Sequence, residues 1–140
     1  MSAVGITESV ISAIESSAFD LIVVNFANCD MVGHTGVLEA GVKAVECVDS
    51  CLDKILSALD AKDGNALIIA DHGNAEKMLN EDNSPNTAHT IFPVPVILFG
   101  SDKKINKDGS LKDVAPTILE LLDLSIPKEM TGKSLLSWIV

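Results

Sequence analysis

The chain has 140 residues, enough for one domain or for a piece of a larger one. Hydrophobic residues make up 47% and charged residues 21%, which is typical of a folded globular protein with an aliphatic core. Twenty acidic residues against ten basic ones give a net charge of −10. A field of this sign repels nucleic acids and anionic membrane surfaces, so neither is an expected partner.

All ten basic residues are lysines, so the chain lacks the planar guanidinium group that usually clamps phosphate. If the substrate is a small phosphoester, we expect its clamp to lie outside this chain. The three cysteines, Cys29, Cys47 and Cys51, form no disulfide framework. No signal peptide and no apolar run of membrane-spanning length are recognisable, so we expect a cytoplasmic protein.

The first half of the chain predicts helix, strand, loop and long helix. Residues 7–18 carry apolar side chains at helical spacing, with Thr7 as the predicted N-cap. Residues 20–27 are β-branched and aliphatic, as in a buried parallel strand, and the polar stretch 28–36 predicts a loop. A long helix then follows, ending near Asp63-Gly64, with one apolar stripe formed by Leu38, Gly41, Val45, Val48, Leu52, Ile55 and Leu59.

The second half predicts two more strands and a last helix. Residues 66–70 are a second buried strand, residues 81–90 a long loop, and residues 94–99 a third strand. Asp113 begins a helix as its N-cap and the helix continues through Leu122. Gly132 to Val140 predicts a short terminal helix.

This order predicts an α/β fold in three α/β/α layers, with a mainly parallel sheet covered by helices. In such sheets, ligands bind beyond the carboxyl ends of the strands. The chain's three histidines all lie in polar segments at or near strand ends, so the residues of interest are expected at that edge.

Two carboxylates and three imidazoles form the candidate metal site: Asp30, His34, Asp71, His72 and His89. This mixture of oxygen and nitrogen donors suits Mn²⁺ or Zn²⁺ better than Ca²⁺. Two metals about 4 Å apart can stabilise the attacking and leaving oxygens in phosphoryl transfer. Five ligands exceed the need of one catalytic metal and are too few for two, so part of a two-metal site is missing.

Each motif also has an ordinary structural interpretation. The pair of Asp30 and His34 alone would more often be a surface hydrogen bond or a helix cap. Residues 71–74 alone could be a strand-ending turn in which Asn74 caps a helix. The three motifs together favour the metal site. Asn25, Asn28 and Asn74 are interpreted as loop-shaping or capping residues, and Cys29 as a bystander.

Five motifs occur in a characteristic order: residues 25–36 (NFANCDMVGHTG), 70–76 (ADHGNAE), 87–90 (TAHT), 113–117 (DVAPT) and 130–135 (MTGKSL). Together they resemble the C-terminal part of the cofactor-independent phosphoglycerate mutases, a family of the alkaline phosphatase superfamily. The resemblance extends from about Ser2 to Leu136, and the first two motifs are specific to the mutases.

The resemblance implies an isomerase that interconverts 2- and 3-phosphoglycerate in glycolysis through a phosphoserine intermediate at two manganese ions. By motif, Asp30, His34 and His89 would bind the first ion, and Asp71 and His72 the second. Zn²⁺ and Co²⁺ are alternatives to Mn²⁺. In the family, the serine nucleophile belongs to an N-terminal segment and the arginine clamp to an inserted domain. We therefore expect residues 1–140 to be a fragment, inactive alone, that is completed by the missing segment.

Two other hypotheses remain open. The first is a phosphopentomutase or a simple metal phosphatase of the same superfamily, which the motif at residues 25–36 argues against. The second is a non-catalytic fragment that binds metal and self-associates, because a truncated sheet leaves an unpaired strand edge.

Overall fold

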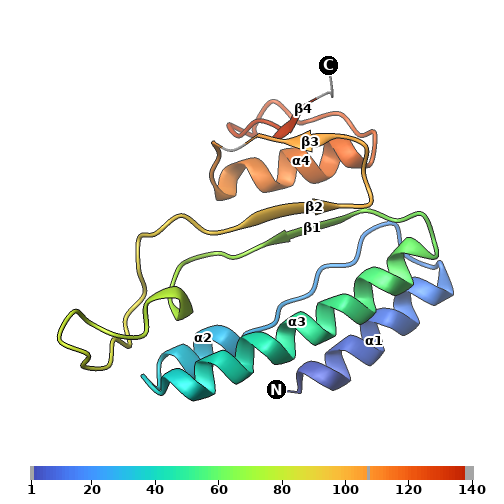
Figure 1. Cartoon of the computed structure of the whole chain (residues 1–140). Coiled ribbons are helices and arrows are strands. Elements are labelled where there is room, and N and C mark those ends of the chain that lie inside the picture. Colours follow the sequence, from blue (N-terminus) through green and yellow to red (C-terminus); the bar gives the residue numbers. More distant parts are fainter. Residues whose placement is uncertain (1, 107, 138–140) are drawn as a thin grey trace. The chain divides into compact units, whose positions relative to one another are not determined.

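The computed structural model describes residues 2–106 and 108–137, which form two compact units. The helical unit comprises Met1–Gly64 and His72–Val94, and the sheet unit comprises Asn65–Asp71 and Pro95–Val140. Figure 1 labels the elements, which are α1 (Ala3–Ser16), α2 (Asn28–Gly33), α3 (Leu38–Asp60), β1 (Ala66–Ile69), the 3₁₀ turn η1 (Ala75–Lys77), β2 (Val96–Phe99), β3 (Lys104–Ile105), the 3₁₀ turn η2 (Leu111–Asp113), α4 (Val114–Leu121) and β4 (Leu136–Ser137). No helix among the described residues is both long and apolar enough to cross a bilayer.

Helix α1 begins earlier than predicted. Ser2 is its N-cap, and the Ser2 side chain accepts a hydrogen bond from the Gly5 N–H at 3.2 Å. The prediction of Thr7 as the cap is wrong, because Thr7 lies inside the helix, where its hydroxyl donates to the Ala3 carbonyl at 2.8 Å. A threonine hydroxyl can bond backwards along a helix as well as forwards at its start, and the sequence pattern does not separate the two cases.

Helix α3 confirms the predicted long helix and packs along α1 in the helical unit (Figure 1). Ile55 of the predicted stripe belongs to the core and Leu59 packs against it, whereas Leu38 and Val45 are exposed. Val10 and Ile14 of α1 and Ile55 of α3 are buried together and form the core of this unit. The chain leaves the helix where predicted. The Gly64 N–H donates to the Leu59 carbonyl at 3.0 Å, a bond that satisfies one of the carbonyls at the helix end.

The predicted strand at residues 20–27 is not a strand in the described structure. Ile22 and Phe26 pack against the core of the helical unit, whereas Leu21, Val23 and Val24 are 50%, 82% and 39% exposed. The segment joins neither of the two described sheets. The apolar pattern specifies an extended chain with a face to bury, but not the neighbour that would complete a sheet.

Residues 28–36 were predicted to be a loop, and they contain α2 instead. The Met31 N–H donates to the Ala27 carbonyl and the His34 N–H to the Asp30 carbonyl, at 3.0 and 3.1 Å. This single helical stretch packs on α3. Six residues are too few for a visible apolar period, so the pattern favoured a loop.

The sheet unit corrects the fold prediction. Strands β1 and β2 confirm the two predicted strands, but they pair antiparallel, with Ala66 opposite Phe99 and Ile69 opposite Val96. Both described sheets are two-stranded and antiparallel, so the mainly parallel sheet is not found in the described residues. Parallel neighbours need a crossover, usually a helix, to bring the chain back to the starting edge. Only loops and the three-residue turn η1 connect β1 to β2.

The C-terminal part of the sheet unit is fastened to α4 by two side chains. Asp113 is the N-cap by position, as predicted, but its carboxylate makes no cap bond to α4. It accepts hydrogen bonds from the Ser110 N–H and the Lys133 N–H, both at 2.8 Å. Thr117, fully buried, accepts a hydrogen bond from the Leu135 N–H at 3.0 Å. These bonds hold residues 133–135 extended, and β4 replaces the predicted terminal helix, whose last residues, 138–140, lie outside the described part.

Candidate metal centre

The first two candidate ligands are positioned by α2: Asp30 lies within the helix and His34 is its C-cap. Asp30 and His34 are four residues apart, so a helical backbone places both side chains on one face. The Asp30 Oδ1 atom lies 3.3 Å from His34 Nε2. The unexpected helix therefore explains why this spacing brings a carboxylate and an imidazole together.

The third ligand arrives from the long loop before β2. His89 Nε2 lies 3.1 Å from Asp30 Oδ1 and 3.1 Å from His34 Nε2. The loop is held by the Asn86 N–H, which donates to the Met78 carbonyl, and by the Thr90 N–H, which donates to the Gly73 carbonyl, both at 2.8 Å. These backbone bonds place His89 next to residues that are more than 50 positions away in sequence. We call Asp30, His34 and His89 the triad.

The triad fits a divalent cation. Its three donor atoms form a nearly equilateral triangle with edges of 3.1 to 3.3 Å. Three ligands each about 2.1 Å from one ion are separated by roughly 3.0 to 3.4 Å in octahedral or tetrahedral geometry. A proton on one imidazole nitrogen could form a hydrogen bond to only one of the other two donor atoms. A metal ion could bind all three donor atoms at once. Among the described residues, the triad is the group of potential ligands whose donor atoms all lie within 4.8 Å.

The tautomer of His34 is fixed by its other ring nitrogen. His34 Nδ1 lies 2.7 Å from the Thr87 carbonyl oxygen. A carbonyl can only accept a hydrogen bond, so Nδ1 carries the proton and donates it. In the neutral ring, Nε2 then presents a lone pair to the other two triad members, the arrangement in which histidines bind metals.

His72 lies beside the triad without joining it. Its ring stacks on the His89 ring with centroids 3.7 Å apart, and its Nε2 is 3.9 Å from Asp30 Oδ1. Asp71 is exposed and ends the first segment of the sheet unit, directly before His72. The structure thus brings together Asp30, His34 and His89, while the pair of Asp71 and His72 as ligands of a second ion stays a prediction.

Sequence reasoning missed three residues around the triad. Asn74 was interpreted as a cap or loop residue, yet it is buried and its Nδ2 donates to Asp30 Oδ1 at 3.3 Å. Glu76 accepts hydrogen bonds from the Asn74 N–H, at 2.7 Å, and from the Thr90 hydroxyl. The hydrogen bond from Thr90, followed by those from backbone N–H groups, holds the pKa of Glu76 below its usual value. The spacing of Asn74 two positions after His72 was a signal, but a turn explained it equally well.

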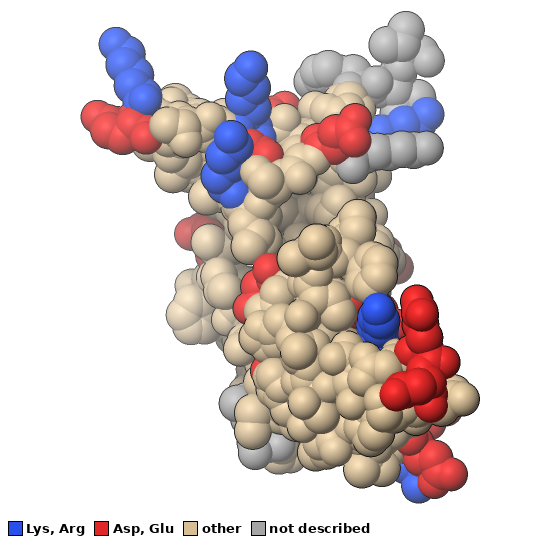
Figure 2. All heavy atoms as spheres, turned by 90° about the vertical axis from the view of Figure 1, so that its left-hand side faces the viewer, with Lys and Arg blue, Asp and Glu red and all other residues tan. Residues whose placement is uncertain are grey.

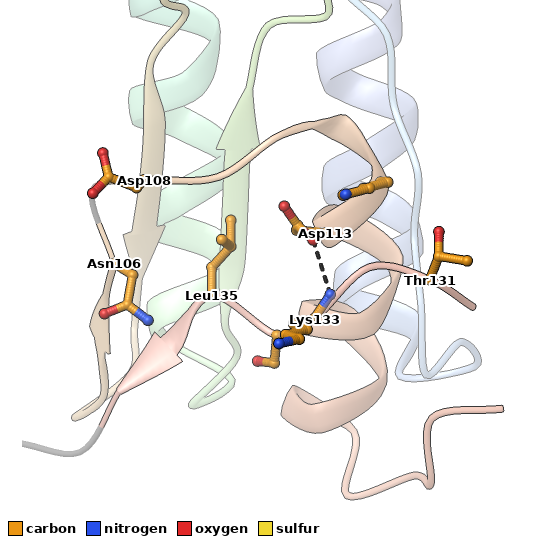
Figure 3. A pocket seen from close by; sticks show the side chains of 8 residues that line it. Asn106, Asp108, Asp113, Thr131, Lys133 and Leu135 are labelled. Atoms are coloured by element: carbon orange, nitrogen blue, oxygen red, sulfur yellow. Dashed lines mark hydrogen bonds between the residues drawn. The ribbon is translucent and has the colours of Figure 1, made fainter. Parts of the chain in front are cut away.

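The sheet unit contains a pocket that is a weaker candidate site than the triad. Its volume is 340 Å³, and Figure 3 shows Asp113, Lys133 and Leu135 among its lining side chains, with the hydrogen bond from the Lys133 N–H to Asp113 dashed. Lysines and aspartates both line it, so it offers no single charge to a ligand. The surface in Figure 2 likewise mixes blue lysines with red acidic groups. The triad is therefore the stronger candidate site.

Comparisons with known proteins agree with this chemistry. The family model described as the Metalloenzyme superfamily matches residues 1–126. A 2,3-bisphosphoglycerate-independent phosphoglycerate mutase of Microcystis aeruginosa is 53% identical over 97% of this chain, and a second enzyme of that name from Methanosarcina barkeri is 59% identical over 97%. The crystal structure of Leishmania mexicana phosphoglycerate mutase at low cobalt concentration superposes with a TM-score of 0.88 and 33% identity, covering 98% of this chain.

These relatives are much longer than the chain. The matched part is 27% of the Microcystis protein, 26% of the Methanosarcina protein and 28% of the Leishmania chain. The similarity concerns the C-terminal quarter of such mutases. The activity of a whole mutase therefore does not pass to this chain by similarity alone.

Proposed function

We infer the function of this chain from its family, since it belongs to the Metalloenzyme superfamily and is homologous to the C-terminal quarter of 2,3-bisphosphoglycerate-independent phosphoglycerate mutases. We propose that it is the C-terminal metal-binding portion of such a mutase, which interconverts 2- and 3-phosphoglycerate in glycolysis. The metal would be Mn²⁺, with Co²⁺ or Zn²⁺ as substitutes. The observation that carries the proposal is the triangle of donor atoms in the triad.

The residues divide between two sites. Asp30, His34 and His89 would hold the first ion. Asp71 and His72 would contribute to the second, together with residues supplied by the rest of the mutase. In the isolated chain, the first site would therefore bind metal more tightly than the second.

When bound, the ions supply positive charge that stabilises oxygens developing negative charge in phosphoryl transfer. The chain's own residues would bind these ions and keep them in position. The Thr87 carbonyl accepts a hydrogen bond from His34 Nδ1, so Nε2 is the ring nitrogen that would bind the ion. The serine nucleophile and the substrate clamp would come from the segment and the domain that this chain does not contain, so we expect no mutase turnover from it alone.

Cobalt titration tests the metal site directly. Visible absorption of Co²⁺ reports coordination number and ligand type, and it requires no activity. We expect one tightly bound Co²⁺ per chain, lost in Asp30→Asn and in His34→Ala. Asp49→Asn makes the same change at an exposed position of α3 and serves as the control. Unchanged binding in both triad variants would overturn the assignment.

An activity assay tests the role as a portion of a mutase. The purified chain should not interconvert 2- and 3-phosphoglycerate. Activity should appear when the chain is combined with the remaining part of a related mutase, and Asp30→Asn should abolish it. Turnover by the chain alone would refute the proposal, and phosphopentose turnover by the combined protein would favour the phosphopentomutase alternative.

The extended segment at residues 20–26 supports the expectation of a further partner. Leu21 and Val23 are 50% and 82% exposed, and an extended apolar segment can pair with another chain. We propose that the isolated chain self-associates through this segment. Sedimentation should show dimers or larger species, and Val23→Lys should shift them to monomers. A wild-type chain that stays monomeric at high concentration would contradict this.

A further inference from the structure

Asn74 is the buried polar residue that contacts the triad. It is 5% exposed, and its Nδ2 donates to Asp30 Oδ1 at 3.3 Å. This is the same oxygen atom that faces His34 and His89. The amide therefore bonds directly to the atom that would bind a metal.

Capping does not explain this side chain. Asn74 stands at the N-cap position of η1, but its side chain makes no cap bond there. Its Oδ1 is also buried and has no hydrogen-bond partner among the described residues. Burying an unsatisfied carbonyl is unfavourable, so a local structural role would more readily be filled by another residue. The bond to Asp30 accounts for an amide at this position.

Neighbouring residues position the Asn74 side chain next to Asp30. The backbone N–H of Asn74 donates to Glu76 Oε2 at 2.7 Å, and the other Glu76 oxygen accepts a hydrogen bond from Thr90. Gly33 also lies against the amide, because a Cβ atom added there would come within 1.9 Å of Asn74 Oδ1. Glycine at position 33 is thus required for the space that the Asn74 carboxamide occupies.

We propose that Asn74 is a positioning residue that fixes the Asp30 carboxylate for metal binding and selects the metal. This inference rests on the proposed metal site. An N–H donor on Oδ1 fixes the side-chain rotamer and favours binding through one oxygen. Ca²⁺ often takes both oxygens of a carboxylate and accepts flexible geometry, whereas smaller ions demand a tighter arrangement. Asn74 therefore favours Mn²⁺ and Co²⁺ over Ca²⁺.

The test measures dissociation constants for Mn²⁺ and Ca²⁺ by calorimetry, with thermal unfolding of the metal-free protein alongside. Asn74→Leu keeps the branched shape of the side chain and removes the donor. Loss of a group that orients a metal ligand typically weakens binding by about 10- to 100-fold. We expect a loss of that size for Mn²⁺ and a much smaller one for Ca²⁺, so the selectivity falls.

Gly33→Ala is a second, independent variant, because it displaces the amide while leaving Asn74 in the sequence. It should reproduce the loss of selectivity. Gly5→Ala is its control, since a Cβ there meets its nearest neighbour at 3.6 Å. Asn80→Ala is the control for the amide, because Asn80 bonds Ser84 and Pro85 within the same unit. Both controls should bind metal as the wild type does.

The possible results distinguish the proposed metal-binding function from the proposed role of Asn74. Wild-type protein that binds no Mn²⁺ would overturn the proposed function and this inference with it. Wild-type binding with an unchanged ratio of Mn²⁺ to Ca²⁺ affinity in Asn74→Leu and Gly33→Ala would overturn the inference alone. Equal losses in Asn80→Ala and Asn74→Leu would also overturn it, because they would indicate general loosening of the loops. A lower melting temperature of the metal-free variants with unchanged selectivity would assign Asn74 a merely structural role and overturn the inference too.

Discussion

Replacing Thr117 by valine should destabilise the protein mainly by leaving one buried N–H without an acceptor. Thr117 is fully buried, and its hydroxyl donates to the Asp113 carbonyl at 2.7 Å and accepts from the Leu135 N–H at 3.0 Å. Valine keeps the shape of the side chain but leaves the buried N–H without an acceptor. Such a loss costs about 1–3 kcal/mol. With a urea dependence of about 2 kcal/mol per molar, a loss of about 2 kcal/mol lowers the unfolding midpoint by about 1 M.

Thr7→Val is the matched control for this measurement. Thr7 is 3% exposed, and its hydroxyl donates to the Ala3 carbonyl within α1, so valine there removes a donor and no acceptor for a buried N–H. We expect a cost below about 1 kcal/mol, within the net value of one ordinary hydrogen bond. Hydrogen exchange of the Leu135 amide should accelerate only in Thr117→Val. Equal midpoints for the two variants, with a slow Leu135 amide in both, would refute the reasoning.

Three further predictions concern the core, acid stability and metal removal. Ile55→Ala deletes a buried side chain that packs on Val10 and Ile14, and it should cost about 2–5 kcal/mol in urea unfolding. Hydrogen bonds from Lys133 and Ser110 hold the pKa of Asp113 below its usual value, so its contribution to stability is present above about pH 5 and lost as the pH falls through the folded-state pKa. Asp113→Asn should flatten the decline of the urea midpoint between pH 6 and pH 3, and an unchanged decline would contradict this. A chelator should lower the melting temperature of the Mn²⁺-loaded wild type but leave that of His34→Ala unchanged.

Local sequence determined the elements whose pattern is long or repeated. The stripe of α3 predicted that helix nearly to its ends, and the aliphatic runs predicted β1 and β2. The aliphatic runs did not predict whether β1 and β2 pair parallel or antiparallel. The direction of pairing depends on the connection, and the segment between Ile69 and Val96 contains no helix long enough to carry the chain across a sheet. The strand predicted at residues 20–27 was wrong for a related reason, because a strand exists only with a hydrogen-bonded neighbour.

Histidines and aspartates in polar segments predicted five candidate ligands, and the resemblance to the mutases grouped Asp30, His34 and His89 as one set. The distances between the donor atoms of the triad could not be predicted. The mutual distances arise from α2, which is too short to read from periodicity, and from backbone bonds such as the one from the Thr90 N–H to the Gly73 carbonyl. Asn74 was misassigned because an asparagine before a turn has a common capping role. Only the observation that its side chain caps nothing and reaches Asp30 distinguishes the two roles.

The positions of the triad residues in the fold bear on whether this chain can bind metal by itself. Asp30 lies in α2 and His34 is the C-cap of that helix, while His89 is positioned by the backbone bond between Thr90 and Gly73, all within the helical unit. Nothing in this set requires residues from the rest of a full-length mutase. The proposed second site at Asp71 and His72, by contrast, needs further ligands. Metal binding at the triad should therefore survive separation from the rest of the enzyme, while phosphoryl transfer should not.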